Sequence, residues 1–253
     1  RQRQMCIRDR YVAGWSSNWG SENCGQTAIQ LLGDLMAEDH LMKEQGANIL
    51  LNIFFGPTVN AARGIAFQIQ SGVTVFVGNF QLAARPQMIK SYAASDIFGL
   101  ISLFYRISRF SFLLLWLMAL PLLFKIDFIL SLWLGEDIPP LSALFSILSL
   151  LIALTESFAS PLTTVVHATG RMRKFQMICS SIILFIVPLS YVVLKIGFQP
   201  ESVMYVSLFV LVMVHVVRLY LLKELISYSV REYVTCVLSV SYTHLRAHET
   251  LRH

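Results

Sequence analysis

Nearly half of this chain lies in long windows with at most one charged side chain, and these windows restrict the fold more than any other feature. A helix rises about 1.5 Å per residue, so about 20 apolar residues cross the ~30 Å hydrocarbon layer of a bilayer. Only 14% of the 253 residues are charged, compared with roughly 25% in a soluble domain. The windows predict an all-α integral membrane protein, a six-helix transmembrane bundle with helices at about 41–56, 60–84, 109–126, 139–167, 175–195 and 202–222.

The two ends of the chain depart from this pattern. Residues 1–10 hold four arginines and one aspartate, a net +3, and residues 234–253 contain three of the six histidines. Residues 1–10 and 241–253 resemble adapter-derived sequence that contaminates assembled reads, so both ends are excluded from the functional interpretation. Residues 1–42 as a whole are interpreted as either a product of misassembly or a cytoplasmic insertion. The transmembrane bundle is therefore assigned to residues 43–233.

Charged residues are distributed unevenly between the predicted connections. Basic residues gather at 85–108, at 168–174 and after the last helix: Arg85, Lys90, Arg106, Arg109, Arg171, Arg173, Lys174 and Lys223. The alternate connections hold Lys125 and Lys195 together with four carboxylates, Asp127, Glu136, Asp137 and Glu201. Cytoplasmic loops carry an excess of Lys and Arg, so the first set is predicted to be cytoplasmic. Apolar residues recur at helical spacing across 86–108, which predicts either an interfacial amphipathic helix or an ordinary linker helix.

Two predicted spans carry polar stripes, which are costly in a bilayer. In the second span, Arg63, Gln70, Thr74 and Gln81 fall within about 40° of one another, with Asn60 at the edge of the same face. In the fourth span, the polar residues within about 60° are Ser142, Ser149, Glu156, Ser160, Thr163 and His167, and Pro161 is expected to kink this helix. The stripes predict either dry packing between helices or a hydrated cavity, and the central charge of Glu156 favours the cavity.

The sequence shows no soluble catalytic motif: it lacks G-x-S-x-G, a phosphate-binding glycine loop and H-E-x-x-H. No C-x-x-C spacing indicates a disulfide framework or a zinc site. We therefore expect no enzyme activity, no cofactor, no metal and no nucleic-acid partner. The expected partner of the long apolar windows is the lipid bilayer.

The run GANILLNIFFGPTVNAARGIAFQIQ (46–70) closely resembles a segment of Wzx-type polysaccharide flippases, which belong to the MATE-like multidrug/oligosaccharidyl-lipid/polysaccharide exporter superfamily. The resemblance spans about residues 43–233, in matching order and spacing. It continues through NFQLAARPQMIKSYAASD (79–96), RFSFLLL (109–115), LWLGEDIPP (132–140), HATGRMRKFQ (167–176) and VPLSYVVLKIGFQP (187–200). The likeness departs before residue 43, and two further C-terminal helices typical of the family are missing.

The resemblance implies half of a two-bundle transporter in the cell inner membrane, with this chain as the C-terminal bundle and the N-terminal six-helix bundle missing. Such proteins flip undecaprenyl-pyrophosphate-linked oligosaccharide outward by alternating access, for surface polysaccharide biosynthesis. Carried over, the role of holding the anionic pyrophosphate points to Arg63. Sugar contacts are expected from Asn60, Gln70, Thr74 and Gln81, and Glu156 is the candidate site for a coupling cation.

Two other functions remain open. A MATE-type multidrug cation antiporter of the same superfamily requires an acidic cavity lined by aromatic residues, and only Glu156 is both acidic and deep. A membrane-embedded glycan-modifying enzyme, such as a polymerase or an acyltransferase, requires paired catalytic groups, usually in a large outer loop. The outer loops predicted here are short, which argues against the enzyme.

Overall fold

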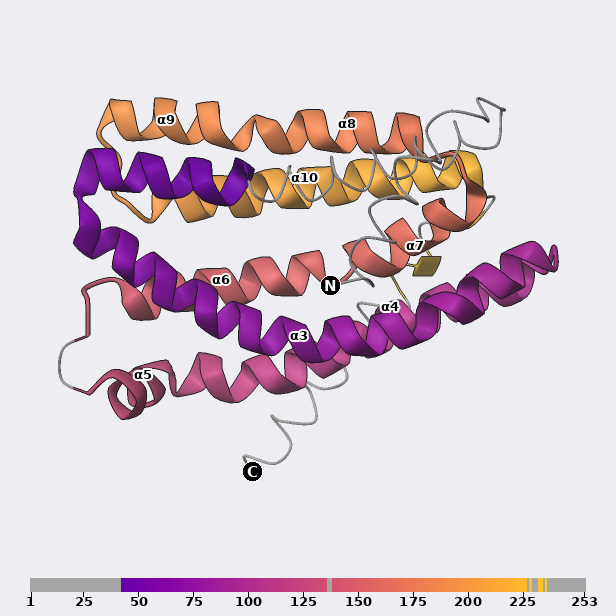
Figure 1. Cartoon of the computed structure of the whole chain (residues 1–253), viewed down its shortest axis with the longest axis horizontal. Coiled ribbons are helices and arrows are strands. Elements are labelled where there is room, and N and C mark those ends of the chain that lie inside the picture. The colour runs from indigo at the N-terminus through magenta and orange to yellow at the C-terminus, as the bar shows by residue number, and fades with distance from the viewer. Residues whose placement is uncertain (1–41, 136–137, 227, 229–231, 234, 236–253) are drawn as a thin grey trace, which may run out of the picture.

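A computed structural model describes residues 42–135, 138–226, 228, 232–233 and 235, and within this part of the chain every regular element is an α-helix (Figure 1). Residues 42–55 are helical. They are followed by α3 (Pro57–Ala93), α4 (Ile97–Phe124), α5 (Ile126–Leu134), α6 (Ser142–Glu156), α7 (Ala159–Thr169), α8 (Met172–Leu184), α9 (Ile186–Ile196) and α10 (Ser202–Leu225). Most of the two terminal segments set apart above, and the loop residues Glu136 and Asp137, lie outside the described residues.

Within the described residues, four segments are long and apolar enough to cross a membrane: Ile97–Phe124, Ser142–Thr169, Met172–Lys195 and Ser202–Leu225. The last three coincide with the predicted spans 139–167, 175–195 and 202–222 to within a few residues. The segment 42–55 and α3 do not reach the same threshold among the described residues. The all-helical fold is therefore confirmed, whereas the number of six spans stays a prediction.

The boundaries of the second and third predicted helices are wrong at their shared connection. The predicted helix 60–84 continues to Ala93, and the predicted helix 109–126 begins at Ile97, so no separate helix forms at 86–108. Between them Ser95 adopts a positive φ of 59°, and the Asp96 side chain caps α4 by accepting a hydrogen bond from the backbone N of Gly99 at 2.8 Å. Helical apolar spacing at this connection therefore belongs to the ends of two long helices.

A proline explains why the fourth predicted span is two helices. Pro161 lacks an N–H group, so it leaves the carbonyl of Ser157, four residues earlier, without its helical donor. The helix is interrupted there, between Glu156 and Ala159. The side-chain amide of Gln81 on α3 donates to that carbonyl, with a distance of 2.9 Å from Nε2 to O. The predicted effect of Pro161 is confirmed, and the break fixes how α3 sits against this segment.

The helices pack side by side, with α6 and α10 near the middle (Figure 1). Helix α3 contacts α4, α6 and α7, while α10 contacts α6, α7, α8 and α9. One end of the bundle holds the α3–α4 connection, the α7–α8 connection and the C-terminus of α10 (Figure 1). The opposite end holds the start of α3, helix α5 and the end of α9 (Figure 1). The predicted basic connections therefore share one end of the bundle.

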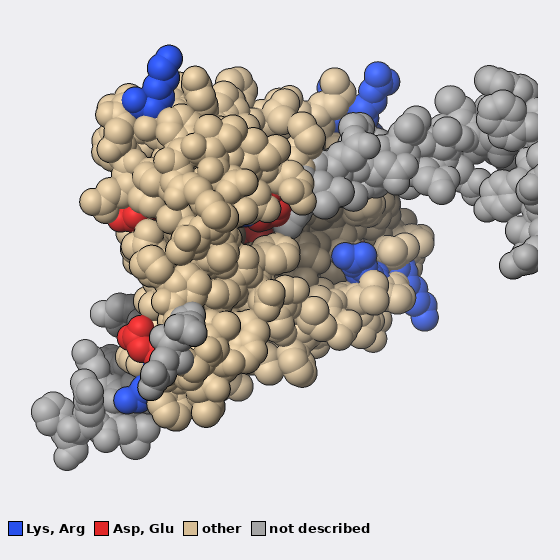
Figure 2. Space-filling model, turned by 60° about the vertical axis from the view of Figure 1, so that its left-hand side comes forward, with Lys and Arg blue, Asp and Glu red and all other residues tan. Residues whose placement is uncertain are grey.

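Large apolar side chains remain exposed along the outside of this bundle, including Phe76, Leu117 and Tyr220. Figure 2 shows a face that is mostly uncharged, with Lys and Arg side chains projecting at its margins. Exposed apolar surface of this extent is unfavourable in water and is typical of a surface that lipid or another protein covers. These features fit a membrane protein.

Candidate functional site

A cavity of about 310 Å³ lies where α3 faces α4 and the end of α6. Its polar lining includes Gln70, Thr74 and Gln81 from α3 and Glu156 from the C-terminal end of α6. The two predicted polar stripes therefore meet across one space. Phe67 contributes the aromatic ring of the lining. The structure thus brings four of the six predicted site residues together.

Thr74 and Gln81 are partly engaged within the protein. The hydroxyl of Thr74 donates to the backbone carbonyl of Gln70 at 3.0 Å. The amide nitrogen of Gln81 is committed to Ser157 at the helix break, as described above. Gln81 therefore has a structural role that the stripe alone does not reveal, because its partner is 76 residues away in sequence.

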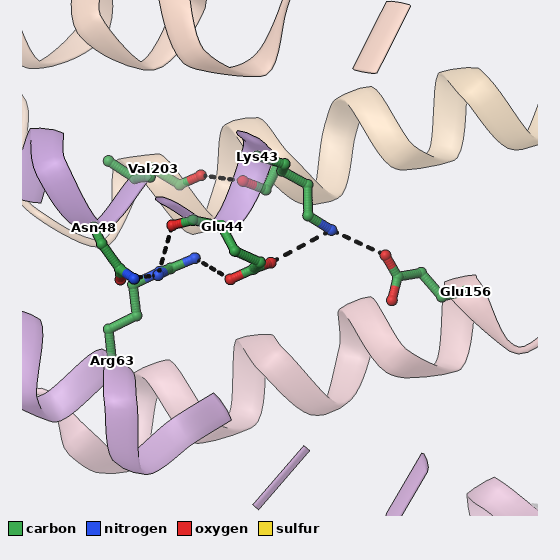
Figure 3. A network of polar contacts seen from close by, with 7 residues as sticks. Lys43, Glu44, Asn48, Arg63, Glu156 and Val203 are labelled. Atoms are coloured by element: carbon green, nitrogen blue, oxygen red, sulfur yellow. Dashed lines mark hydrogen bonds and ion pairs between the residues drawn. The ribbon is translucent and has the colours of Figure 1, made fainter. Parts of the chain in front are cut away.

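Arg63 lies beside this cavity and belongs to a network of charged side chains (Figure 3). Its guanidinium forms an ion pair with the carboxylate of Glu44 at 2.5 Å and donates to the side-chain oxygen of Asn48. Lys43 bridges the two carboxylates of the network, with its Nζ 3.5 Å from Glu44 and 3.0 Å from Glu156. Two cations and two carboxylates make this quartet electrically neutral.

The network joins three parts of the fold. Lys43, Glu44 and Asn48 come from the helix 42–55, Arg63 from the start of α3, and Glu156 from the end of α6 (Figure 3). Lys43 is buried to 6% exposure, which is unusual for lysine unless it is paired. The network thus ties the first described helix to both stripes.

Sequence reasoning missed Lys43 and Glu44 as site residues. Both residues lie at the very start of the stretch that resembles the flippases, but the resemblance assigned neither of them a role. A signal was present, because Glu44 and Asn48 are four residues apart and therefore share one helix face. The pairing of Lys43 with Glu156 had no such signal, since 113 residues separate them.

The remaining predicted residues lie away from the larger cavity. Asn60 is half-buried, and its side-chain oxygen has no hydrogen-bond partner within the described part of the chain. Ser149 lies in a small cavity of about 20 Å³ that Lys43, Glu44 and Arg63 also line. Thr163 donates to its own helix at the carbonyl of Ala159, and His167 is exposed. Of the polar stripe on the fourth predicted span, only Ser149 and Glu156 thus line one of these two cavities.

The larger cavity has a mixed lining, in which polar groups lie among apolar side chains. Amide and hydroxyl groups dominate the polar lining of the larger cavity, and the charges are paired at its edge. Among the described residues no group of three or more His, Cys, Asp or Glu side chains comes close enough to hold a metal ion. The chain matches no family model, no curated protein and no solved structure.

Proposed function

We propose that this chain is one half of an inner-membrane transporter that flips undecaprenyl-pyrophosphate-linked oligosaccharide to the outer leaflet by alternating access. The observation that carries the proposal is the cavity of about 310 Å³, in which amide and hydroxyl groups lie among apolar side chains, in a bundle whose outer surface is apolar. Polar groups at membrane depth are retained where they serve a ligand or water. The resemblance of residues 46–70 to polysaccharide flippases supports the same function.

The chemistry of the site suits a sugar attached to a diphosphate. Gln70, Thr74 and Gln81 offer donors and acceptors that sugar hydroxyls can pair with, and Phe67 offers an apolar surface. Arg63 is the residue proposed to hold the diphosphate, because a guanidinium presents several donors in one plane to phosphate oxygens. Its Nε is buried and has no hydrogen-bond partner within the described residues.

Alternating access moves two bundles around a shared site, so the proposal includes the missing N-terminal six-helix bundle as a partner. The lipid bilayer is the second partner. Glu156 is proposed to hold the coupling cation, because its carboxylate faces the larger cavity.

A multidrug cation antiporter is the alternative within the same superfamily. Such a cavity needs several carboxylates and aromatic rings to bind lipophilic cations. The lining of the larger cavity offers one carboxylate, Glu156, and one aromatic ring, Phe67. Glu156 is moreover paired with Lys43 at 3.0 Å. These features favour the flippase over the antiporter and leave the glycan-modifying enzyme as a third outcome of the test below.

The test is complementation in a bacterium that lacks its own polysaccharide flippase. The transporter that contains this chain should restore surface polysaccharide, detected by lectin or antibody binding to whole cells. Arg63→Ala should abolish the restored export, whereas Arg173→Ala, which removes an exposed arginine, should leave it unchanged.

Wild-type export by Arg63→Ala at normal protein levels would contradict the proposed role of Arg63. Drug resistance conferred without any polysaccharide export would favour the antiporter. Accumulation of glycan of altered length or acylation in the flippase-deficient host, without any restored export, would favour the enzyme.

A further inference from the structure

The helix 42–55 places two of its own charges on the two groups that a transported ligand would need. The carboxylate of Glu44 lies 2.5 Å from the guanidinium of Arg63. One residue earlier, the ammonium of Lys43 lies 3.0 Å from the carboxylate of Glu156. A single turn of one helix therefore holds both an anion and a cation in place (Figure 3).

The space around Arg63 is too small for a ligand while Glu44 is present. The cavity that Arg63, Glu44 and Lys43 share measures about 20 Å³, enough for about one water molecule. Phe67 and Gln70 line both this cavity and the larger one, so the two spaces are neighbours. A diphosphate that enters from the larger cavity can reach Arg63 only after the Glu44 carboxylate leaves.

Glu44 does not use the full donor capacity of Arg63. The terminal nitrogens of Arg63 bond to Glu44 and Asn48, but its Nε is buried without a partner in the described part of the chain. Leaving a buried donor unpaired is costly. A diphosphate carries more acceptor oxygens than one carboxylate and can satisfy this donor as well, so it can compete with Glu44.

We propose that Glu44 and Lys43 are tethered competitors of the transported ligands. In this assignment, which rests on the proposed function, Glu44 occupies the diphosphate site on Arg63 and Lys43 occupies a monovalent metal-cation site on Glu156. Both leave together when the helix turn moves. The free energy needed to move that turn is required only once when both ligands bind. The diphosphate therefore raises the affinity of the protein for the cation, and the cation raises its affinity for the diphosphate.

Charge balance supports joint displacement. A diphosphate that replaced Glu44 alone would leave Glu44 and Glu156 sharing the single ammonium of Lys43. A cation that binds Glu156 at the same time allows Lys43 to leave with Glu44 as an ion pair, which already exists at 3.5 Å. The released turn therefore carries no net charge, the bound cation neutralises Glu156, and Arg63 neutralises part of the negative charge of the diphosphate.

The test is direct binding to the full chain in detergent micelles, by isothermal titration calorimetry. The probes are farnesyl diphosphate and inorganic pyrophosphate, in Na⁺ or in choline at constant ionic strength and pH. Glu44→Gln should tighten diphosphate binding by roughly tenfold to a hundredfold, the equivalent of one charge-assisted hydrogen bond. Arg63→Gln should lose binding. Na⁺ should tighten binding to the unmodified chain but not to Glu156→Gln.

Two comparisons identify the source of the effect. If Glu44→Gln raises the affinity for both probes equally, the site binds the diphosphate group itself. If it raises the affinity for farnesyl diphosphate alone, the site binds a lipid-linked diphosphate. Glu224→Gln, which removes the same charge from an exposed position on α10, should change nothing. Should Glu44→Gln fail to fold, Glu44→Asp shortens the side chain by one methylene and should also tighten binding.

Unchanged or weaker diphosphate binding in folded Glu44→Gln, with binding lost in Arg63→Gln, would overturn the tethered competitors while the flippase proposal stands. Binding that does not depend on Na⁺ in the unmodified chain would overturn the joint displacement. Failure of both the unmodified chain and Glu44→Gln to bind either probe would overturn this inference and also the diphosphate site of the proposed function.

Discussion

The hydrogen bond from Gln81 to the carbonyl of Ser157 joins α3 to the break between α6 and α7. Its length is 2.9 Å and both groups are buried. Pro161 supplies no N–H to that carbonyl, so in Gln81→Leu the carbonyl would lose its donor while the side-chain volume is nearly kept. A buried group left without a partner costs about 1–3 kcal/mol, and hydrogen bonds between membrane helices average about 0.6 kcal/mol. We expect Gln81→Leu to lower the free energy of unfolding by about 1–2 kcal/mol.

A double-mutant cycle separates this cause from a general loss of packing. Pro161→Ala restores an N–H group four residues after Ser157, so the carbonyl regains a helical donor. In that background Gln81→Leu should cost about 1 kcal/mol less than it does in the unmodified chain. The free energies are measured by unfolding in mixed dodecyl maltoside and SDS micelles, followed by circular dichroism.

Gln70 provides the matched control, since it lies on the same face of α3 and lines the same cavity. Gln70→Leu should cost the same with and without Pro161, because the control tests only the polarity of the lining. An equal cost of Gln81→Leu in both backgrounds would refute the reasoning, because it would show that the cost does not come from the carbonyl of Ser157.

Three further predictions concern packing, capping and pH. Gly46→Ala would place a Cβ 2.6 Å from a methyl group of Val187 on α9. This clash should lower the free energy of unfolding by about 1–3 kcal/mol. Adding Val187→Ala should restore most of that loss. Gly99→Ala would place a Cβ 2.1 Å from the carboxylate that caps α4 and should lower the free energy of unfolding by about 1 kcal/mol. Gly64→Ala, in open space within α3, should instead raise it by about 0.5–1 kcal/mol. Equal effects of the two variants in denaturant unfolding would contradict this. Burial, together with two neighbouring tyrosines, raises the pKa of Tyr228. Its contribution to stability is therefore complete below pH about 10 and is lost as the pH rises above that value. Thermal unfolding should show this loss in the unmodified chain and not in Tyr228→Phe.

The sequence predicted much of this fold because the relevant signals are local. Apolar windows with at most one charged side chain each located the last three spans, and Pro161 located the break in one of them. The helical spacing of the polar residues predicted that Gln70 and Thr74 share one face of their helix, and both line the cavity that Glu156 also lines. Spacing of this kind depends only on the geometry of a single helix.

The errors occurred where local signals allow two structures. Apolar residues at helical spacing around Ile89 and Tyr92 are compatible with a helix on the membrane surface and with the continuation of α3. The choice depended on the turn at Ser95 and the cap at Asp96, which bring the two long helices into contact. Packing between helices thus decided a boundary that periodicity left open.

What the sequence determined by itself is the all-helical fold, the apolar character of four long helices and the grouping of basic residues at one end. What only the tertiary structure decided is which charges meet. Lys43 and Glu156 are 113 residues apart, and Glu44 pairs with Arg63 across the turn between the helix 42–55 and α3. No local pattern encodes such pairs, because an ion pair depends on distances in space, and in an apolar bundle a buried charge is tolerated only where a partner lies within a few ångströms.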